Sequence, residues 1–102
     1  MEHDKETCEQ ELFVIEYLES HSGTDACDAE FHAEFHKRFG GKFARKNFGA
    51  QPVFKAQRLL ARMAKDGILE RVVVGMSYAQ AEPGFPRWVY VYYLNNDHDN
   101  QA

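Results

Sequence analysis

The sequence of 102 residues has no long apolar run and only two cysteines, and it lacks the signatures of common catalytic sites. No stretch approaches the roughly 20 apolar residues that a membrane-spanning helix needs, so we expect no association with a membrane. Residues 1–4 lack the basic flank and apolar run that begin a secretory signal. Together these absences favour a cytoplasmic protein.

The cysteines and serines do not form a recognisable reactive site. Cys8 and Cys27 have no metal-type spacing and fall on different predicted helices, so we favour reduced, buried thiols over a disulfide. Ser20, Ser22 and Ser77 lie in no nucleophile motif, and no glycine-rich phosphate loop follows a strand. The sequence therefore predicts a protein that is not an enzyme and that needs no cofactor.

His32 and His36 are four residues apart, the spacing at which two helical imidazoles can share a metal ion. Glu34 takes the third position of this run rather than the second, so the run is not the zinc-protease motif. The favoured interpretation is that both histidines are polar flanks of a helix. A metal site is the alternative.

Acidic side chains are scarce in the middle of the chain, and basic side chains are scarce in its first third. Residues 1–36 hold eleven acids and one base, whereas residues 37–74 hold ten bases and two acids. The net charge of −4 hides this separation. One nucleic-acid-facing side would explain it. Alternatively, the acidic and basic helices neutralise each other within the fold.

The length and composition suit one small domain with a real core. Apolar residues make up 44% of the chain and aromatic residues 14%, which is too apolar for a chain that is disordered throughout. We expect a domain over residues 6–94. The ends, residues 1–5 and 95–102, are polar and are expected to be disordered.

A first helix is predicted over about residues 6–21. Its apolar stripe is Leu12, Ile15 and Leu18, while Phe13 and Tyr17 lie well round from that stripe. The apolar surface is therefore wider than one face requires. Either this helix is buried on two sides, or its extra face meets a second copy in a homodimer.

A second helix is predicted between two breaks. Asp25 is expected to cap its start, with Asp28 as a further negative charge in the first turn. Phe31, Phe35 and Phe39 repeat every four residues and form its buried stripe. Gly40 and Gly41 end it. The connection over 42–51 is expected to contain a short helical turn anchored by Phe43 and Phe48.

A basic helix over residues 53–65 follows Pro52, which suits the first helical position. Gly67 suits the left-handed position that closes a helix. Residues 68–74 and 87–94 then have the composition of two strands, joined by a turn-rich segment, 76–86. In the second strand Trp88, Tyr90, Tyr92 and Leu94 share one face, which we assign to the core rather than to base stacking.

The run from Ala56 to Arg71 resembles the recognition helix and first wing strand of winged helix-turn-helix regulators of the MarR and PadR kind. Residues 86–94, Pro-Arg-Trp-Val-Tyr-Val-Tyr-Tyr-Leu, are similar to the returning wing strand of PadR proteins. The resemblance covers roughly residues 51–94. It implies a mainly α, α+β fold of three helices and a C-terminal β-hairpin wing. Unlike those families, the segment 76–86 has no Lys or Arg, and no dimerisation helix follows Leu94.

The basic helix and the resemblance together predict a duplex-DNA-binding transcriptional regulator. Helix 53–65 would enter the major groove, and neighbouring Lys and Arg side chains would bind the phosphates. The predicted DNA-binding residues are Lys42, Arg45, Lys46, Lys55, Arg58, Arg62 and Lys65, with Lys55 and Arg58 nearest the bases of the DNA. Alternatively, the same residues form an ordinary solvent-exposed helix face whose charges serve solubility.

A different function remains open for the same fold. The strongly acidic first third, the spare apolar surface of the first helix and the absence of bases in 76–86 also suit a protein-interaction module. Such a module would be an adaptor or an inhibitor that binds a basic protein partner through its acidic N-terminal helices.

Overall fold

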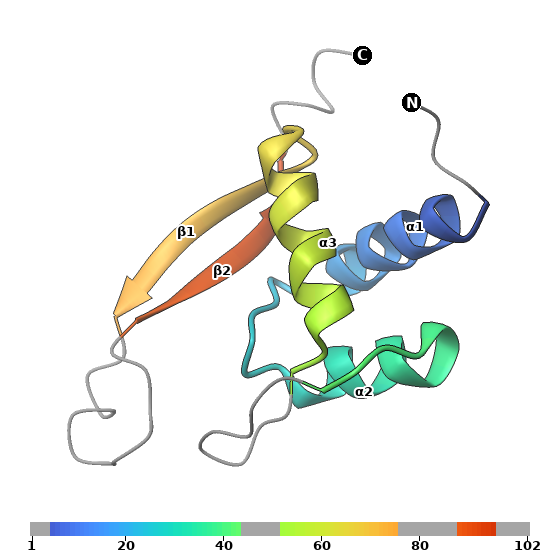
Figure 1. The fold of residues 1–102 in the computed structure, drawn as a ribbon. Helices are drawn as coiled ribbons and strands as arrows, with labels where there is room; N and C mark the ends of the chain where they lie inside the picture. Colours follow the sequence, from blue (N-terminus) through green and yellow to red (C-terminus); the bar gives the residue numbers. More distant parts are fainter. Residues whose placement is uncertain (1–4, 44–51, 76–87, 96–102) are drawn as a thin grey trace.

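The computed structural model describes residues 5–43, 52–75 and 88–95, which form three helices followed by an antiparallel hairpin (Figure 1). This mainly helical α+β arrangement is the predicted one, and it is consistent with a winged-helix topology. Within these residues, no helix is long and apolar enough to cross a membrane. The elements are α1 (Lys5–Ser20), α2 (Ala29–Phe39), α3 (Phe54–Lys65), β1 (Leu69–Gly75) and β2 (Trp88–Leu94).

The ends of the described domain differ by a residue from the expected bounds. Lys5 is the first residue of α1. Asn95, after β2, donates its backbone N–H to the carbonyl of Ile68 and its side-chain amide to the carbonyl of Gly67. The other residues of the predicted disordered ends lie outside the described ranges, as do Phe48 and most of the predicted turn over 42–51.

The buried face of α1 differs from the predicted stripe. Phe13, Val14, Tyr17 and Leu18 are buried, whereas the side chain of Leu12 is 54% exposed. Phe13 stacks on Phe31 of α2 with ring centroids 5.6 Å apart. Aromatic rings bury more area than a leucine side chain, so α1 presents Phe13 and Tyr17 to the phenylalanines of α2. The face that the sequence suggested as spare is the core face.

The phenylalanine stripe of α2 is confirmed. Phe31 and Phe35 are fully buried and Phe39 is partly buried against the same cluster. The predicted cap was wrong, because Asp28 rather than Asp25 is the N-cap residue and accepts the N–H of Phe31. Asp25 instead accepts the N–H of Cys27 within the preceding turn, where Asx side chains favour local backbone bonds.

Both cysteines are free thiols, and neither is fully buried. Cys8 is exposed on α1, contrary to the expectation of a buried thiol, and Cys27 is half-buried before α2. Burial, reinforced by the neighbouring carboxylate of Asp25, raises the pKa of the Cys27 thiol. At neutral pH this favours the protonated, unreactive form.

The end of α2 and the start of α3 lie side by side. Gly40 and Gly41 end α2 as predicted, with φ angles of 76° and 105°. A Cβ at Gly41 would lie 2.8 Å from Cγ1 of Val53, so the close approach of the two segments requires glycine. Phe43 and Val53 also form an isolated antiparallel bridge. This contact fixes where α3 begins.

Helix α3 begins later than expected and ends as expected. Val53 is its N-cap in an extended conformation, so Pro52 precedes the helix instead of occupying its first position. At the C-terminus, Gly67 has a φ of 88°, and its N–H donates to the carbonyl of Ala64. The N–H of Ile68 donates to the carbonyl of Met63. These two bonds form the Schellman motif that a glycine at this position predicts.

The base of the hairpin is anchored to the helices and to their connection. Register pairs Leu69 with Leu94 at the base and Gly75 with Trp88 at the far end. Near the base, Thr24 bridges Tyr92 through two backbone hydrogen bonds of 2.9 and 3.1 Å. This bridge adds one residue from the α1–α2 connection to the edge of β2. Figure 1 shows the free end of the hairpin extending away from the helices.

Candidate nucleic-acid interface

Helix α3 turns one stripe of side chains towards solvent. Ala56, Leu59, Leu60 and Met63 are buried in the core. On the opposite side Phe54, Arg58 and Lys65 are exposed and Ala61 is half-buried. The spacing of four, three and four residues places these four side chains in one row along the helix. The positions of the buried apolar residues of α3 therefore decide which of its Lys and Arg side chains face outward.

Arg58 and Lys65 are the outward-facing bases of α3. Within residues 5–43, 52–75 and 88–95, neither side chain forms an ion pair with a carboxylate. Phe54, at the N-terminal end of the same row, has a side chain that is 44% exposed. The row thus presents two cations, one ring and one methyl group to solvent.

Lys55 and Arg62 lie instead on the flank of α3 that meets α1. The Nζ of Lys55 is 3.7 Å from a carboxylate oxygen of Glu6. The guanidinium of Arg62 donates to Glu11 at 2.5 Å, and the Glu11 side chain is only 17% exposed. The Nε of Arg62 is buried without a hydrogen-bond partner in the described residues. The acidic first helix therefore neutralises two of the predicted DNA-binding bases.

Of the three basic residues predicted to bind DNA before α3, the structure describes only Lys42. Lys42 is exposed, and its backbone carbonyl accepts the N–H of Phe54 at 2.9 Å. This bond places Lys42 beside the N-terminus of α3. Arg45 and Lys46 lie outside the described residues.

The hairpin has an apolar and aromatic surface that the sequence interpretation missed. Val72, Val73, Val74 and Trp88 are all exposed, with Val73 at 58% and Trp88 at 50%. Tyr92, predicted for the same strand face as Trp88, is indeed part of the core. Trp88 is not: it is half-exposed, although its neighbour Val89, on the opposite face of β2, is buried. The alternation of the strand could not show where the core ends.

His32 links the N-terminus of α3 to the α1–α2 connection through its two ring nitrogens. Its Nδ1 accepts the N–H of Val53 at 3.1 Å, and its Nε2 lies 3.0 Å from the carbonyl of Asp25. Because Nδ1 must accept, Nε2 carries the proton and donates to Asp25. Burial lowers the pKa of His32 below 6.5, against the opposing effects of Asp25 and Asp28. The neutral ring is therefore the native form.

This use of His32 bears on the metal alternative. His32 would have to give up one of its backbone bonds to bind a metal ion, while His36 on the same helix contacts the carbonyl of Gly41 at 3.1 Å. In the parts of the chain that the structure describes, no group of three or more His, Cys, Asp or Glu side chains is arranged to hold a metal ion. The structural role of His32 accounts for its burial.

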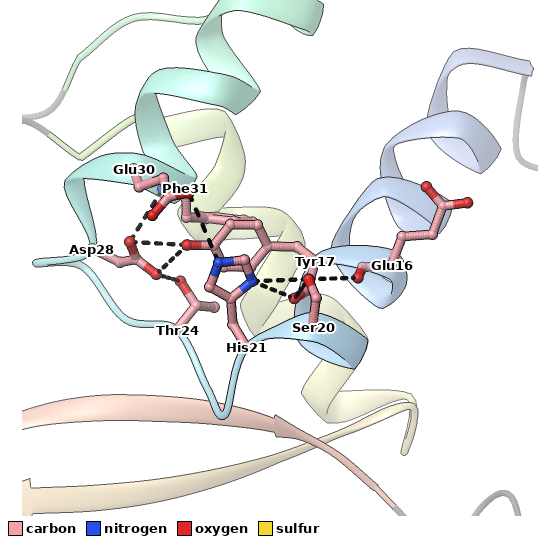
Figure 2. A network of polar contacts seen from close by, with 8 residues as sticks. All are labelled: Glu16, Tyr17, Ser20, His21, Thr24, Asp28, Glu30 and Phe31. Atoms are coloured by element: carbon pink, nitrogen blue, oxygen red, sulfur yellow. Dashed lines mark hydrogen bonds and ion pairs between the residues drawn. The ribbon is translucent and has the colours of Figure 1, made fainter.

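Asp28 joins α1, α2 and the bridge to β2, as Figure 2 shows. Its carboxylate accepts the hydroxyl of Tyr17 at 3.0 and 3.2 Å, the hydroxyl of Thr24 at 2.8 Å and the N–H of Phe31 at 3.1 Å. Burial and the bond to Asp28 raise the pKa of Tyr17 above its usual value. His21 stacks on the Tyr17 ring with centroids 3.9 Å apart. This network fixes the helices that support α3.

A shallow hollow of about 240 Å³ lies between α1 and α2. Glu16, Glu30 and Glu34 line it together with the rings of Phe13 and Tyr17. Arg38 also lines it; its Nε donates to Glu34 at 3.1 Å and its guanidinium lies 5.0 Å from the Phe13 ring centre. The hollow is an acidic surface with an internal counter-charge.

Comparison with known proteins identified no similar protein. The chain matches no family model, and no curated protein or solved structure is significantly similar to it. The function has to be inferred from the geometry of the chain itself.

Proposed function

We propose that this protein is a winged-helix protein that binds duplex DNA, with α3 in the major groove and the β1–β2 hairpin as its wing. The observation that carries the proposal is the outward row of α3, in which Arg58 and Lys65 have no carboxylate partner among the described residues. An α-helix fits the major groove, where side chains meet the edges of the bases.

The row also suggests what each side chain does. Arg58, near the middle of α3, is placed to donate two hydrogen bonds to a guanine edge. Phe54 and Ala61 offer apolar contacts to thymine methyl groups. Lys65 at the end of α3 and Lys42 beside its start would bind phosphates on either side. Such a division between base contacts and phosphate contacts is usual for a helix in the major groove.

Lys55 and Arg62 take a secondary role in this proposal. Both are held by carboxylates of α1, so each would contact a phosphate only by sharing or leaving its present partner. The negative charge of α1 also limits how closely that flank can approach DNA. Transcriptional regulation is the biological role that a sequence-reading duplex-binding protein of this size would serve.

The alternative function is a protein-interaction module, and one observation favours it. Val72, Val73 and Val74 are exposed on β1, an apolar edge of the kind that pairs with other chains. The acidic helices α1 and α2 would then bind a basic partner. Two features keep the DNA proposal first: the exposed bases of α3 and their place just before the hairpin.

A binding titration with matched charge variants tests the proposal. Fluorescence anisotropy with a labelled mixed-sequence duplex, at several salt concentrations from about 50 to 200 mM, gives affinity and salt slope together. Replacing Arg58 and Lys65 by alanine should weaken binding, and the loss of the Lys65 phosphate contact should reduce the slope by about one. Lys5 and Lys37, exposed on α1 and α2, provide a control that removes the same charge. Equal loss in both double variants would refute the assignment of α3.

A further inference from the structure

We infer that the hairpin carries a stacking site for an unpaired nucleobase, formed by Trp88, Tyr90 and Arg71. The inference rests on the proposed nucleic-acid function and extends it. The ligand would be a duplex, held by α3, that adjoins single-stranded or locally opened DNA. The hairpin would take an exposed base of that strand.

The three side chains share one face of the hairpin. Register places Trp88 opposite Gly75, Tyr90 opposite Val73 and Tyr92 opposite Arg71, and alternate residues of a strand share a face. The rings of Trp88 and Tyr90 are 4.9 Å apart at 69°, an edge-to-face contact. Tyr90 in turn packs against the core. Tyr90 therefore supports one side of the indole, and half of the Trp88 surface stays open to solvent.

The position across from Trp88 is also open. Gly75 has no side chain, and a Cβ built there would meet nothing within 4 Å. Elsewhere in the hairpin a directly opposite side chain would cover part of the indole. The pairing of tryptophan with glycine thus leaves room for an incoming ring beside the indole.

Arg71 adds a cation to this surface. Its guanidinium lies 4.3 Å from the centre of the Tyr90 ring, which holds the planar group by a cation–π contact. Among the described residues, no carboxylate forms an ion pair with it. A stacked guanidinium still presents donors in its plane, and these suit a phosphate next to the stacked base.

The chemistry favours an unpaired base over the duplex itself. Inside a duplex the faces of the bases are covered by their neighbours, so away from the duplex ends an exposed ring can stack only on a base that has left the helix. The segment 76–86 between the strands contains no Lys or Arg. With no cation in this segment, the hairpin relies on stacking by Trp88 more than on phosphate contacts.

The single tryptophan of the chain makes the test direct, because all tryptophan fluorescence comes from Trp88. The protein would be titrated with a blunt duplex and with the same duplex carrying a short thymidine overhang. We expect the overhang to tighten binding by about tenfold, the ratio for stacking one base, and to quench the emission. Equal affinity for both probes, with no quenching by the overhang, would overturn the inference and leave the duplex proposal standing.

Variants separate stacking from a general effect on folding. Trp88→Ala should lose the advantage of the overhang but keep the affinity for the blunt duplex, and Trp88→Phe should retain part of that advantage. Leu12→Ala, at a side chain of similar exposure on α1, is the matched control and should change neither affinity. An overhang preference that survives in Trp88→Ala would place the stacking site elsewhere. Absence of binding to either probe would reject both this inference and the proposed function.

Discussion

The Nδ1 of His32 accepts the backbone N–H of Val53, 3.1 Å away and 21 residues along the chain. The bond connects the first turn of α2 to the residue that caps α3. Val53 cannot cap the helix with its own side chain, and no side-chain cap bond is present. The position of the first turn of α3, and with it the direction of Phe54 and Arg58, therefore depends on a neutral imidazole.

This dependence predicts a loss of stability in acid. Burial lowers the folded pKa of His32 below 6.5, so between that value and 6.5 the unfolded chain binds a proton that the folded chain does not. The free energy of unfolding should then decrease as the pH falls through this window, by at most about 1.4 kcal/mol per pH unit from this group. His32→Gln keeps an acceptor and a donor but does not titrate. Urea unfolding at several pH values should show a shallower decrease for this variant, and an unchanged decrease would contradict the assignment.

Replacing Asp28 by alanine should destabilise the fold through three lost bonds. The variant removes the N-cap of α2 and leaves the hydroxyls of Tyr17 and Thr24 without their acceptor. We expect a decrease of about 2–3 kcal/mol in the free energy of unfolding, measured by urea denaturation. Tyr17→Phe removes only one of these bonds and should cost about 1 kcal/mol. Similar losses in the two variants would mean that Asp28 does not join the three elements.

Glu11→Gln should increase DNA affinity by releasing Arg62. The guanidinium of Arg62 is paired with this carboxylate, and without the charge it becomes available to a phosphate. We expect binding to a duplex at low salt to tighten roughly threefold to tenfold, about the effect of one added phosphate contact. Glu19→Gln, at an exposed residue of the same helix, controls for the change in net charge. The same gain in both variants would show that only net charge matters.

Two glycine variants test the close approach of α2 and α3. Gly41→Ala places a methyl group 2.8 Å from Val53 in a left-handed backbone conformation, so both strain and overlap oppose it. We expect a decrease of about 2–4 kcal/mol in the free energy of unfolding. Gly40→Ala has the strain alone, because a Cβ there meets nothing within 4 Å, and should cost about 1–2 kcal/mol. Thermal or urea unfolding of the two variants measures the difference between their free energies of unfolding.

Local sequence signals predicted the elements well where the cause was local. The phenylalanine repeat of α2, the glycine that ends α3 and the β-rich runs around residues 69–75 and 88–94 each depend on residues within a few positions. Predictions failed where two candidates competed. Asp25 and Asp28 are both good N-caps, and the hydroxyl of Tyr17, which helps to hold the Asp28 carboxylate, comes from a different helix, α1.

The sequence by itself determined that a basic amphipathic helix precedes two strands, because helical periodicity, glycine conformation and β-branched composition act over short distances. Only the tertiary structure decided which charges are available. It paired Arg62 and Lys55 with acids about 50 residues earlier in the chain, and it left Arg58, Lys65 and Trp88 exposed. Ion pairs and solvent exposure depend on how elements pack against one another, and that packing is set by the aromatic core that α1 and α2 share.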